Sequence, residues 1–176
     1  MKNMKKWAVL LMTAALLTGG TSTVWAGSAQ PESAAADTAV EKTDYGFTYG
    51  ENQYKPGMDA ADAMKKLGEY SSSRDVNNCA NGYINKAYMY GGKAFEVYVE
   101  QVDGKEVVAN ITLLTSEVAT EEGLKPGDSS EQVTKIYKDA QKGLGTYTTT
   151  LGNTKLYIKM KNDTVSFISY MIAEEK

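Results

Sequence analysis

The chain contains no histidine and a single cysteine, Cys79, among its 176 residues. The absence of histidine excludes Ser-His-Asp and Cys-His catalysis, and every zinc site that uses an imidazole ligand. One cysteine cannot form an intramolecular disulfide or a thiolate metal cluster. We expect Cys79 to be a small buried apolar residue, with an intermolecular or reactive thiol as the alternative.

Other catalytic groups are scarce too. No S-x-x-K sequence, which would suit a Ser-Lys dyad, occurs in the chain. Catalysis would therefore depend on carboxylates, lysine or tyrosine, and no pair of carboxylates stands out as a general acid and base. We expect a non-enzymatic protein that uses no metal and no cofactor.

Positive charge is in deficit over most of the chain. Residues 27–176 contain 16 basic and 22 acidic residues, which gives a formal net charge of −6. An acidic chain with scattered basic residues is a poor partner for nucleic acid, because phosphate neutralisation supplies most of that affinity. The chain also lacks a polybasic cluster that would hold it to an anionic membrane.

Residues 1–26 have the parts of a secretory signal peptide. Three lysines within residues 1–6 precede an uncharged, mostly apolar run at residues 7–17, and small residues then predict cleavage after Ala26. The apolar run is shorter than the roughly 20 residues that cross a bilayer, which argues against an uncleaved anchor. Gly20 stands where a lipoprotein would carry its lipidated cysteine. We expect a secreted, extracellular protein with no lipid anchor and no stable membrane insertion after cleavage.

Residues 27–44 have the composition of a disordered spacer. They are rich in Ala, Ser, Glu and Thr, and they contain no aromatic residue. Such a segment cannot bury a core. Tyrosines and glycine-punctuated apolar runs begin at Tyr45, and residues 45–176 have the size of a single domain.

An internal repeat is the most informative feature of this domain. The sequence Lys-Pro-Gly occurs at residues 55–57 and again at residues 125–127. Each copy precedes apolar residues at the helical spacing i, i+3, i+4, i+7. These are Ala60, Ala63, Met64 and Leu67 in the first half, and Val133, Ile136, Tyr137 and Ala140 in the second. Asp59 and Asp128 are the predicted N-terminal caps of the two helices.

Three strands are expected after each helix, separated by Gly, Asn and Asp turn signals. They are predicted at residues 87–90, 95–99 and 107–113 in the first half, and at 147–151, 156–161 and 165–172 in the second. One such unit is too small to bury its own apolar face, so the two units must share a core. The predicted fold is α+β, with two tandem helix-β-β-β repeats (45–115 and 116–176) whose short helices pack on antiparallel sheet.

The sequence GMDAADAMKKLG at residues 57–68 is similar to the G-M-x-x-x-x-V-x-x-x-x-G signature of β-lactamase-inhibitor-protein-like repeats, to which SmpA/OmlA-type lipoproteins are related. GDSSEQV at residues 127–133 resembles a more degenerate copy. Through NCANG at 78–82 and TEEGLKPGDS at 120–129, the chain also resembles a group of uncharacterised secreted proteins and lipoproteins of Gram-positive bacteria. The resemblance implies two repeats that form a concave sheet for gripping another protein. The chain lacks the paired cysteines of the inhibitor repeats, so no inhibitory residue is transferred to it.

A polar loop predicted at residues 71–82 is one candidate site. Its candidate functional residues are Asp75, Asn77, Asn78 and Cys79. Oxygen ligands in this loop suggest calcium, but the EF-hand pattern fails because Ala80 replaces the turn glycine and Lys86 stands where the bidentate glutamate belongs. No metal site is therefore expected, and Asx turns that order the loop are the alternative to a functional role.

Tyrosines on the predicted strands form the second candidate site, for which we select Tyr88, Tyr90, Tyr98 and Tyr157. Tyr98 and Tyr157 alternate with apolar residues, so we expect them to face away from the core. Exposed tyrosines suit a protein or glycan contact surface, while cross-strand pairing that stabilises the sheet is the alternative. Three lysines near Tyr157 are interpreted as protection of a sheet edge: Lys155, Lys159 and Lys161.

These patterns favour a secreted, non-enzymatic module that binds an unidentified protein or cell-envelope component through its sheet face. An enzyme that acts on cell-wall or glycan substrates is one alternative, and it requires two carboxylates within about 10 Å of each other. A small-ligand carrier is the other, and it requires an apolar cavity of at least about 300 Å³.

Overall fold

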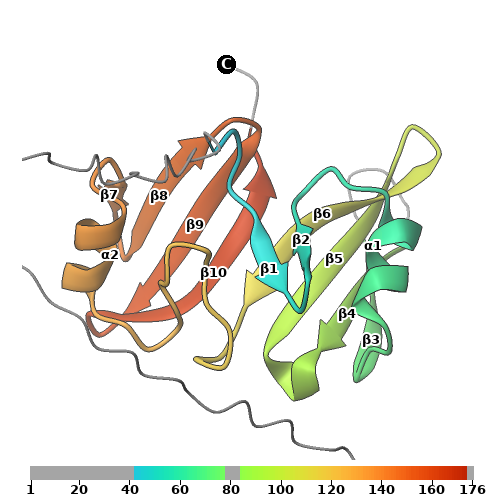
Figure 1. Cartoon of the computed structure of the whole chain (residues 1–176), viewed down its shortest axis with the longest axis horizontal. Coiled ribbons are helices and arrows are strands. Elements are labelled where there is room, and N and C mark those ends of the chain that lie inside the picture. The colour runs from blue at the N-terminus through green and yellow to red at the C-terminus, as the bar shows by residue number, and fades with distance from the viewer. Residues whose placement is uncertain (1–41, 78–83, 174–176) are drawn as a thin grey trace, which may run out of the picture. The chain divides into compact units, whose positions relative to one another are not determined.

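The structure, a computed structural model, describes residues 42–77 and 84–173. Within them the chain is mixed α+β and consists mostly of antiparallel sheet, which confirms the predicted fold class at this level (Figure 1). The helices are α1 (Ala60–Leu67) and α2 (Ser130–Ile136), with a 3₁₀ turn η1 (Gly91–Lys93). The strands are β1 (Phe47–Tyr49), β2 (Asn52–Tyr54), β3 (Ser72–Asn77), β4 (Ile84–Tyr90), β5 (Phe95–Val102), β6 (Lys105–Leu113), β7 (Gln141–Gly143), β8 (Thr146–Leu151), β9 (Thr154–Lys161) and β10 (Thr164–Ile172).

Eight of these strands form one antiparallel sheet in the order β3-β4-β5-β6-β10-β9-β8-β7. Strands β1 and β2 form a separate two-stranded hairpin. In the middle of the large sheet, β6 and β10 pair over only four residues each, from Ile168↔Leu113 to Met171↔Asn110. The sheet therefore has two four-stranded halves, β3–β6 and β7–β10, which meet at β6 and β10.

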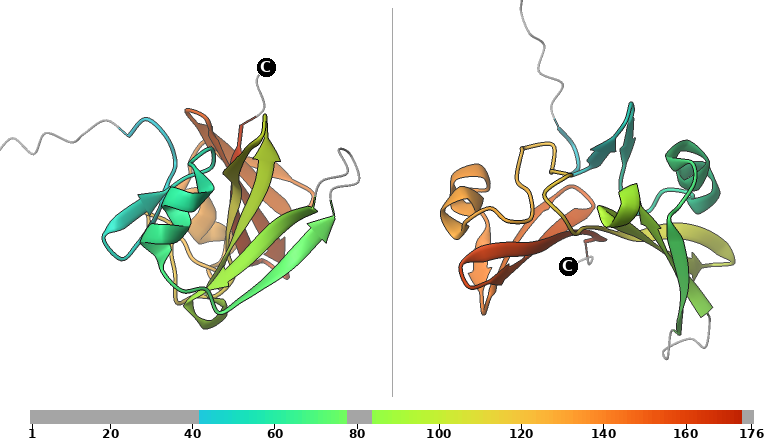
Figure 2. Two further views of the ribbon diagram at one scale, coloured as in Figure 1. Left: turned by 90° about the vertical axis from the view of Figure 1, so that its right-hand side faces the viewer. Right: turned by 90° about the horizontal axis from the view of Figure 1, so that it is seen from below.

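One face of the large sheet carries both helices and the β1–β2 hairpin, and the other face carries no helix of the described residues (Figure 2). Buried and half-exposed residues alternate along β5 and β9, because successive side chains of a strand point to opposite faces. We call the helix-free side the open face. A row of register partners crosses all eight strands on this face: Ser72, Met89, Glu96, Thr112, Ser169, Tyr157, Thr148 and Gln141. The open face comprises these residues and the other side chains that point to the same side of the sheet.

The core lies on the helix side of the sheet and continues across both halves. Phe47 of β1 is buried, and its ring centroid lies 4.9 Å from that of Phe95 in the first half and 6.3 Å from that of Tyr170 in the second. Burial of one such aromatic side chain contributes about 1.5–3 kcal/mol to folding. The β1–β2 hairpin therefore helps to hold the two halves together.

Helix α1 begins and ends where the sequence predicts. The Asp59 side chain accepts a hydrogen bond from the backbone N–H of Asp62 at 3.0 Å, and Gly68 follows the helix with a φ of 76° that favours glycine. Ala60 and Ala63 lie on the buried side of the helix. Small residues at these positions allow α1 to pack closely on the sheet.

Helix α2 differs from its prediction at both ends. Its N-terminal cap is Ser129, whose hydroxyl accepts the N–H of Gln132 at 3.3 Å. The carboxylate of Asp128, the predicted cap, instead accepts the N–H of Lys125 at 2.9 Å and stabilises the preceding turn. The helix also ends before Ala140, because the chain turns away after Tyr137.

Equivalent backbone hydrogen bonds attach each Pro-Gly segment to the sheet. In the first half, Gly57 N–H donates to the carbonyl of Val108 at 2.8 Å, and Val108 N–H donates to the carbonyl of Met58 at 2.9 Å. The corresponding bonds in the second half join Gly127 to Val165 at 2.8 Å and Val165 to Asp128 at 2.7 Å. Both halves therefore seat the start of their helix against the sheet in the same way.

Each half of the large sheet contains one strand more than predicted, and the β1–β2 hairpin was not predicted either. Strand β3 occupies part of the segment 71–82 that we predicted as a loop, and β7 precedes the strand predicted at 147–151. Both extra strands lie at the edges of the sheet and have a single neighbour. Their residues are mostly exposed, so the apolar alternation that marks a half-buried strand is missing from their sequences.

Candidate functional site

The open face is the first candidate site, and Tyr98 and Tyr157 both lie on it, as expected. Tyr98 is the register partner of Asn110, and Tyr157 is the partner of Ser169. Three strand-to-strand steps separate β5 from β9, which corresponds to about 14 Å. Two aromatic side chains at this separation suit contact with a macromolecule. Their role in binding stays a prediction.

The two tyrosines are held differently. The side-chain amide of Asn85 is buried and donates to the Tyr98 hydroxyl at 2.7 Å, which fixes the orientation of that ring. Tyr157 lies beside Phe167, with ring centroids 6.1 Å apart and planes inclined by 33°. The Tyr98 hydroxyl is thus engaged within the protein, while Tyr157 and Phe167 form a half-exposed aromatic pair.

Tyr88 and Tyr90 do not belong to the open face, which corrects our selection of them. They are the register partners of Val97 and Phe95, so their side chains point to the helix side. Tyr90 is only 1% exposed, and its burial raises the pKa of its hydroxyl to about 12. The sequence assigns β4 residues to a strand but leaves the face of each residue undetermined until its register with β5 is known.

The residues selected in the polar segment 71–82 do not form a loop site in the described part of the chain. Asp75 and Asn77 lie on the edge strand β3, where they pair with Lys86 and Ile84. This register places Asp75 on the helix side, opposite Tyr98 and Tyr157. Asn78 and Cys79 lie outside the described residues, as do the signal-peptide and most of the spacer predictions. No group of three His, Cys, Asp or Glu residues that could hold a metal occurs within residues 42–77 and 84–173.

The lysines of β9 do not protect a sheet edge, which corrects that interpretation. Strand β9 lies between β10 and β8, and the edges of the sheet are β3 and β7. Lys155, Lys159 and Lys161 therefore project from the interior of the sheet surface. Their side chains share the open face with Tyr157, because all four residues alternate along the same strand.

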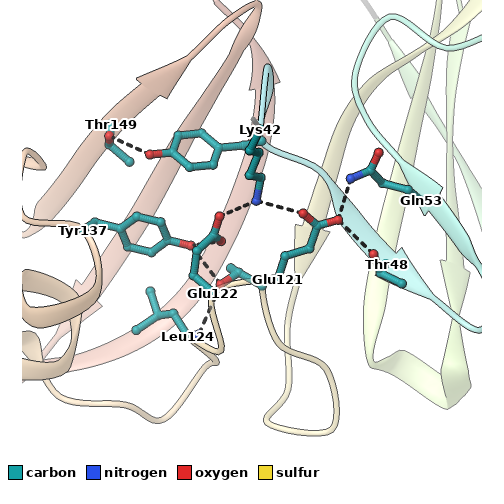
Figure 3. Close-up of polar contacts among 10 residues, drawn as sticks. Lys42, Thr48, Gln53, Glu121, Glu122, Leu124, Tyr137 and Thr149 are labelled. Atoms are coloured by element: carbon teal, nitrogen blue, oxygen red, sulfur yellow. Dashed lines mark hydrogen bonds and ion pairs between the residues drawn. The ribbon is translucent and has the colours of Figure 1, made fainter. Parts of the chain in front are cut away.

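A second candidate site lies on the helix side, where the N-terminal segment meets the connection between the halves (Figure 3). Lys42 Nζ forms ion pairs with both Glu121 and Glu122, and the distance to Glu121 Oε2 is 2.8 Å. The other carboxylate oxygen of Glu121 accepts hydrogen bonds from Gln53 at 2.6 Å and Thr48 at 2.9 Å, in the β1–β2 hairpin. We call this cluster, together with Tyr137 and Thr120, the junction.

Tyr137 ties the junction to the end of α2. Its hydroxyl donates to Glu122 Oε2 at 2.6 Å and lies 2.8 Å from the hydroxyl oxygen of Thr120. Thr120 Oγ1 in turn accepts the backbone N–H of Leu124 at 3.1 Å. Burial and the neighbouring Glu122 carboxylate raise the pKa of Tyr137, so it stays protonated and acts as a donor.

The charges of the junction stabilise one another. Burial acts to raise the pKa of the Glu121 and Glu122 carboxyls, but hydrogen bonds from Lys42 and its neighbours outweigh it and lower both pKa values. Burial likewise acts to lower the pKa of Lys42, and its two carboxylate partners raise it. All three groups are therefore ionised at neutral pH. A glycosidic acid/base pair needs one carboxyl with a raised pKa, which this arrangement does not supply.

The junction was not predicted from the sequence, because Lys42 falls in the predicted spacer and no pair of carboxylates stood out as a general acid and base. A signal was present in the segment Thr120–Leu124, where a threonine and a glycine three residues later frame two adjacent glutamates. In the structure this segment is a turn in which Gly123 N–H donates to the Thr120 carbonyl at 2.9 Å. The basic partner, however, lies about 80 residues earlier in the chain, and no local pattern indicates it.

Two hollows on the surface have charged linings. One of about 300 Å³ adjoins the junction and is lined in part by Lys42, Glu122 and Lys138. The other, of about 420 Å³, is lined in part by Asp44 and Lys55, whose side chains form an ion pair at 3.0 Å. Both hollows are open to solvent and mix charged with apolar side chains, whereas a carrier encloses a small ligand in a mostly apolar cavity.

Comparisons of the chain with protein-family models, curated proteins and solved structures found no match. Neither α1 nor α2 has the length and apolarity of a membrane-spanning helix, within the residues that the structure describes.

Proposed function

We propose that the protein is an exported, non-enzymatic module that binds another protein or a cell-envelope component through the open face of its sheet. The observation that carries this proposal is the position of Tyr98 and Tyr157, one in each half, on a sheet face that neither α1 nor α2 covers. Tyrosine provides a large contact area with few rotatable bonds, so its fixation on binding costs little entropy. A face of this kind supports contact with a macromolecule better than enclosure of a small ligand.

The proposal includes an internal duplication. The two halves have the same order of elements, one helix followed by four strands, and they attach their Pro-Gly segments to the sheet with equivalent hydrogen bonds. Two such units side by side create a wide surface from a short chain. Duplication then accounts for a contact surface that neither half could form alone.

Export is proposed from residues 1–26, whose charge and apolar pattern are those of a signal peptide. Expression of the full chain in a Gram-positive host should release a protein whose N-terminal residue is Gly27. Mass spectrometry of the culture medium tests this, and an uncleaved chain retained by the cells would contradict it.

The binding proposal is tested by capture from envelope extract and culture medium with immobilised protein. The double variant Tyr98→Ala/Tyr157→Ala should lose partners that the unaltered protein retains. A matched control is Tyr70→Ala, because Tyr70 is 47% exposed and contacts Tyr88 on the helix side. Capture that is unchanged in the double variant, or equally reduced in the control, contradicts binding through the open face.

A further inference from the structure

The second half of the sheet is basic, although the chain as a whole is acidic. Residues 141–173 contain four lysines and a single acidic residue, Asp163, which lies in the turn between β9 and β10. The net charge of residues 27–176 is nevertheless −6. The basic residues of this region are therefore gathered, contrary to our expectation that basic residues are scattered through the chain.

Three of these lysines form a row on the open face: Lys155, Lys159 and Lys161. Alternate residues of a strand lie about 6.7 Å apart, so the row extends over about 20 Å along β9. Tyr157 lies within this row. On the adjacent strand β8 the same face carries three hydroxyl side chains, those of Thr146, Thr148 and Thr150.

The lysine row is not neutralised by the described part of the protein. None of its three members forms an ion pair with any residue in 42–77 or 84–173. The first half differs, because Arg74 Nη2 on its open face pairs with Glu96 Oε1 at 2.9 Å. The lysine row therefore gives the open face of the second half a positive charge, which an anionic ligand can complement.

We propose that the lysine row and Tyr157 bind a linear phosphate-bearing polymer of the cell envelope, aligned along β9. This inference rests on the proposed function, since it names the class of partner for the same open face. The lysine ammonium is a compact point charge that binds phosphate well, and the threonine hydroxyls of β8 provide further donors to phosphate oxygens. Tyr157 offers its ring to the uncharged part of the polymer between phosphates.

The choice of phosphate over carboxylate follows from the donors of this surface, since lysine and threonine side chains are common donors to the phosphate oxygens of a polymer. Arginine pairs bidentately with carboxylate and phosphate alike through its planar fork, whereas lysine acts as a point charge. The only arginine of the chain, Arg74, lies in the first half and is already paired with Glu96. An acidic peptide therefore finds no arginine partner in the second half.

Inorganic polyphosphate, titrated into the purified protein and followed by calorimetry, tests the inference. Three lysine contacts to a flexible polyanion predict a slope of log K against log salt of about −2, so a rise from 50 to 200 mM salt should weaken binding about 20-fold. The variant Lys155→Gln/Lys159→Gln/Lys161→Gln should raise Kd at least about 10-fold at low salt and flatten this slope. Tyr157→Ala should raise Kd by a smaller factor and leave the slope unchanged, because it removes no charge.

The control variant carries the same change of charge on the helix side, as Lys65→Gln/Lys66→Gln/Lys135→Gln, and should keep Kd within about twofold. Equal loss in the two triple variants would overturn the inference, and so would equally tight binding of poly-glutamate and polyphosphate. Circular dichroism and thermal melting confirm that each variant is folded. If polyphosphate fails to bind while capture still depends on Tyr98 and Tyr157, this inference fails and the proposed function stands. If capture depends on neither tyrosine, the proposed function fails.

Discussion

The two halves of the sheet share a framework but present different side chains on the open face. At the centre, where β6 meets β10, the hydroxyls of Thr112 and Ser169 lie 2.8 Å apart. Glu96 pairs with Thr112 on one side, and Tyr157 pairs with Ser169 on the other. Equivalent places beside this central pair thus carry a carboxylate in the first half and an aromatic ring in the second.

This difference separates the residues that build the fold from those available for binding. Val108 and Val165 make equivalent bonds to the Pro-Gly segments and are buried in both halves, because they pack under the helices. Within the described residues no helix lies above the side chains of the open face, so the chemistry of the exposed ones is free to differ. We therefore expect the specificity of the proposed binding module to lie in the contrast between the two open-face surfaces.

The largest expected effect concerns the contact that holds the halves together. Phe47→Ala should lower the free energy of unfolding by about 3–5 kcal/mol, because it leaves a cavity between Phe95 and Tyr170. Urea denaturation of residues 27–176, which contain no tryptophan, measures the loss when it is followed by tyrosine fluorescence and circular dichroism. Phe167→Ala on the open face is the matched control and should cost about 1 kcal/mol. A loss below about 1 kcal/mol for Phe47→Ala would show that the hairpin does not couple the halves.

The next effect concerns the junction. Glu122→Gln keeps the shape of the side chain but removes the negative charge that pairs with Lys42. It should lower the free energy of unfolding by about 1–3 kcal/mol at neutral pH. The pKa values of Glu121 and Glu122 are lowered in the folded protein. Their contribution to stability is therefore complete above the ordinary value of 4.5 and is lost as the pH falls through the lower folded values. The raised pKa of Lys42 acts at the opposite end, where its contribution is lost as the pH rises above 10.5.

The free energy of unfolding, measured between pH 7 and pH 3, tests whether the junction carboxylates lose their stabilising effect on acidification. The unaltered protein should lose more stability on acidification than Glu122→Gln does. Glu117→Gln serves as the control, since Glu117 is exposed and forms no ion pair with the described residues. Identical acid sensitivity in the unaltered protein and Glu122→Gln would contradict a stabilising ion-pair cluster.

A smaller effect distinguishes the two tyrosines of the open face. Tyr98→Phe should cost about 1 kcal/mol, because the buried amide of Asn85 loses its acceptor. Tyr157→Phe should change the free energy of unfolding by less than about 0.5 kcal/mol, since its ring packing with Phe167 is kept. Chemical denaturation of both variants measures these free energies of unfolding. Equal losses in the two variants would contradict the difference between Tyr98 and Tyr157.

The smallest effect is expected for the exposed ion pair of the first half. Arg74 is 61% exposed in its side chain, so its pairing with Glu96 should contribute about 0.5 kcal/mol or less. A double-mutant cycle with Arg74→Ala and Glu96→Ala measures the coupling directly. A coupling above about 2 kcal/mol would mean that this pair belongs to the structural framework and not to the variable surface.

Much of the fold could be predicted from the sequence, because it depends on local patterns. The helical spacing after each Pro-Gly, the turn signals and the strict alternation in β5 each identified an element close to its observed bounds. The edge strands β3 and β7 were missed, since strands with one neighbour and little burial carry no apolar alternation. The cap of α2 was placed one residue early, because Asp128 and Ser129 are both good capping residues and only the turn geometry decides between them.

The candidate site was less predictable, because it depends on register and on distant contacts. Alternation alone placed Tyr98 and Tyr157 on the open face, but Tyr90 required its pairing with Phe95. The lysine row needed the strand order, which puts β9 inside the sheet. The role of Lys42 depends on its contact with Glu121, which lies beyond the whole first half of the domain in the sequence. No pattern near Lys42 indicates this contact.

Tyrosine-specific chemical labelling of the protein, alone and with a captured partner bound, tests binding through the open face most directly. The labelling of Tyr98 and Tyr157 should fall on binding, while that of Tyr70 on the helix side should stay unchanged. Protection of Tyr70, with Tyr98 and Tyr157 labelled as in the free protein, would contradict the account.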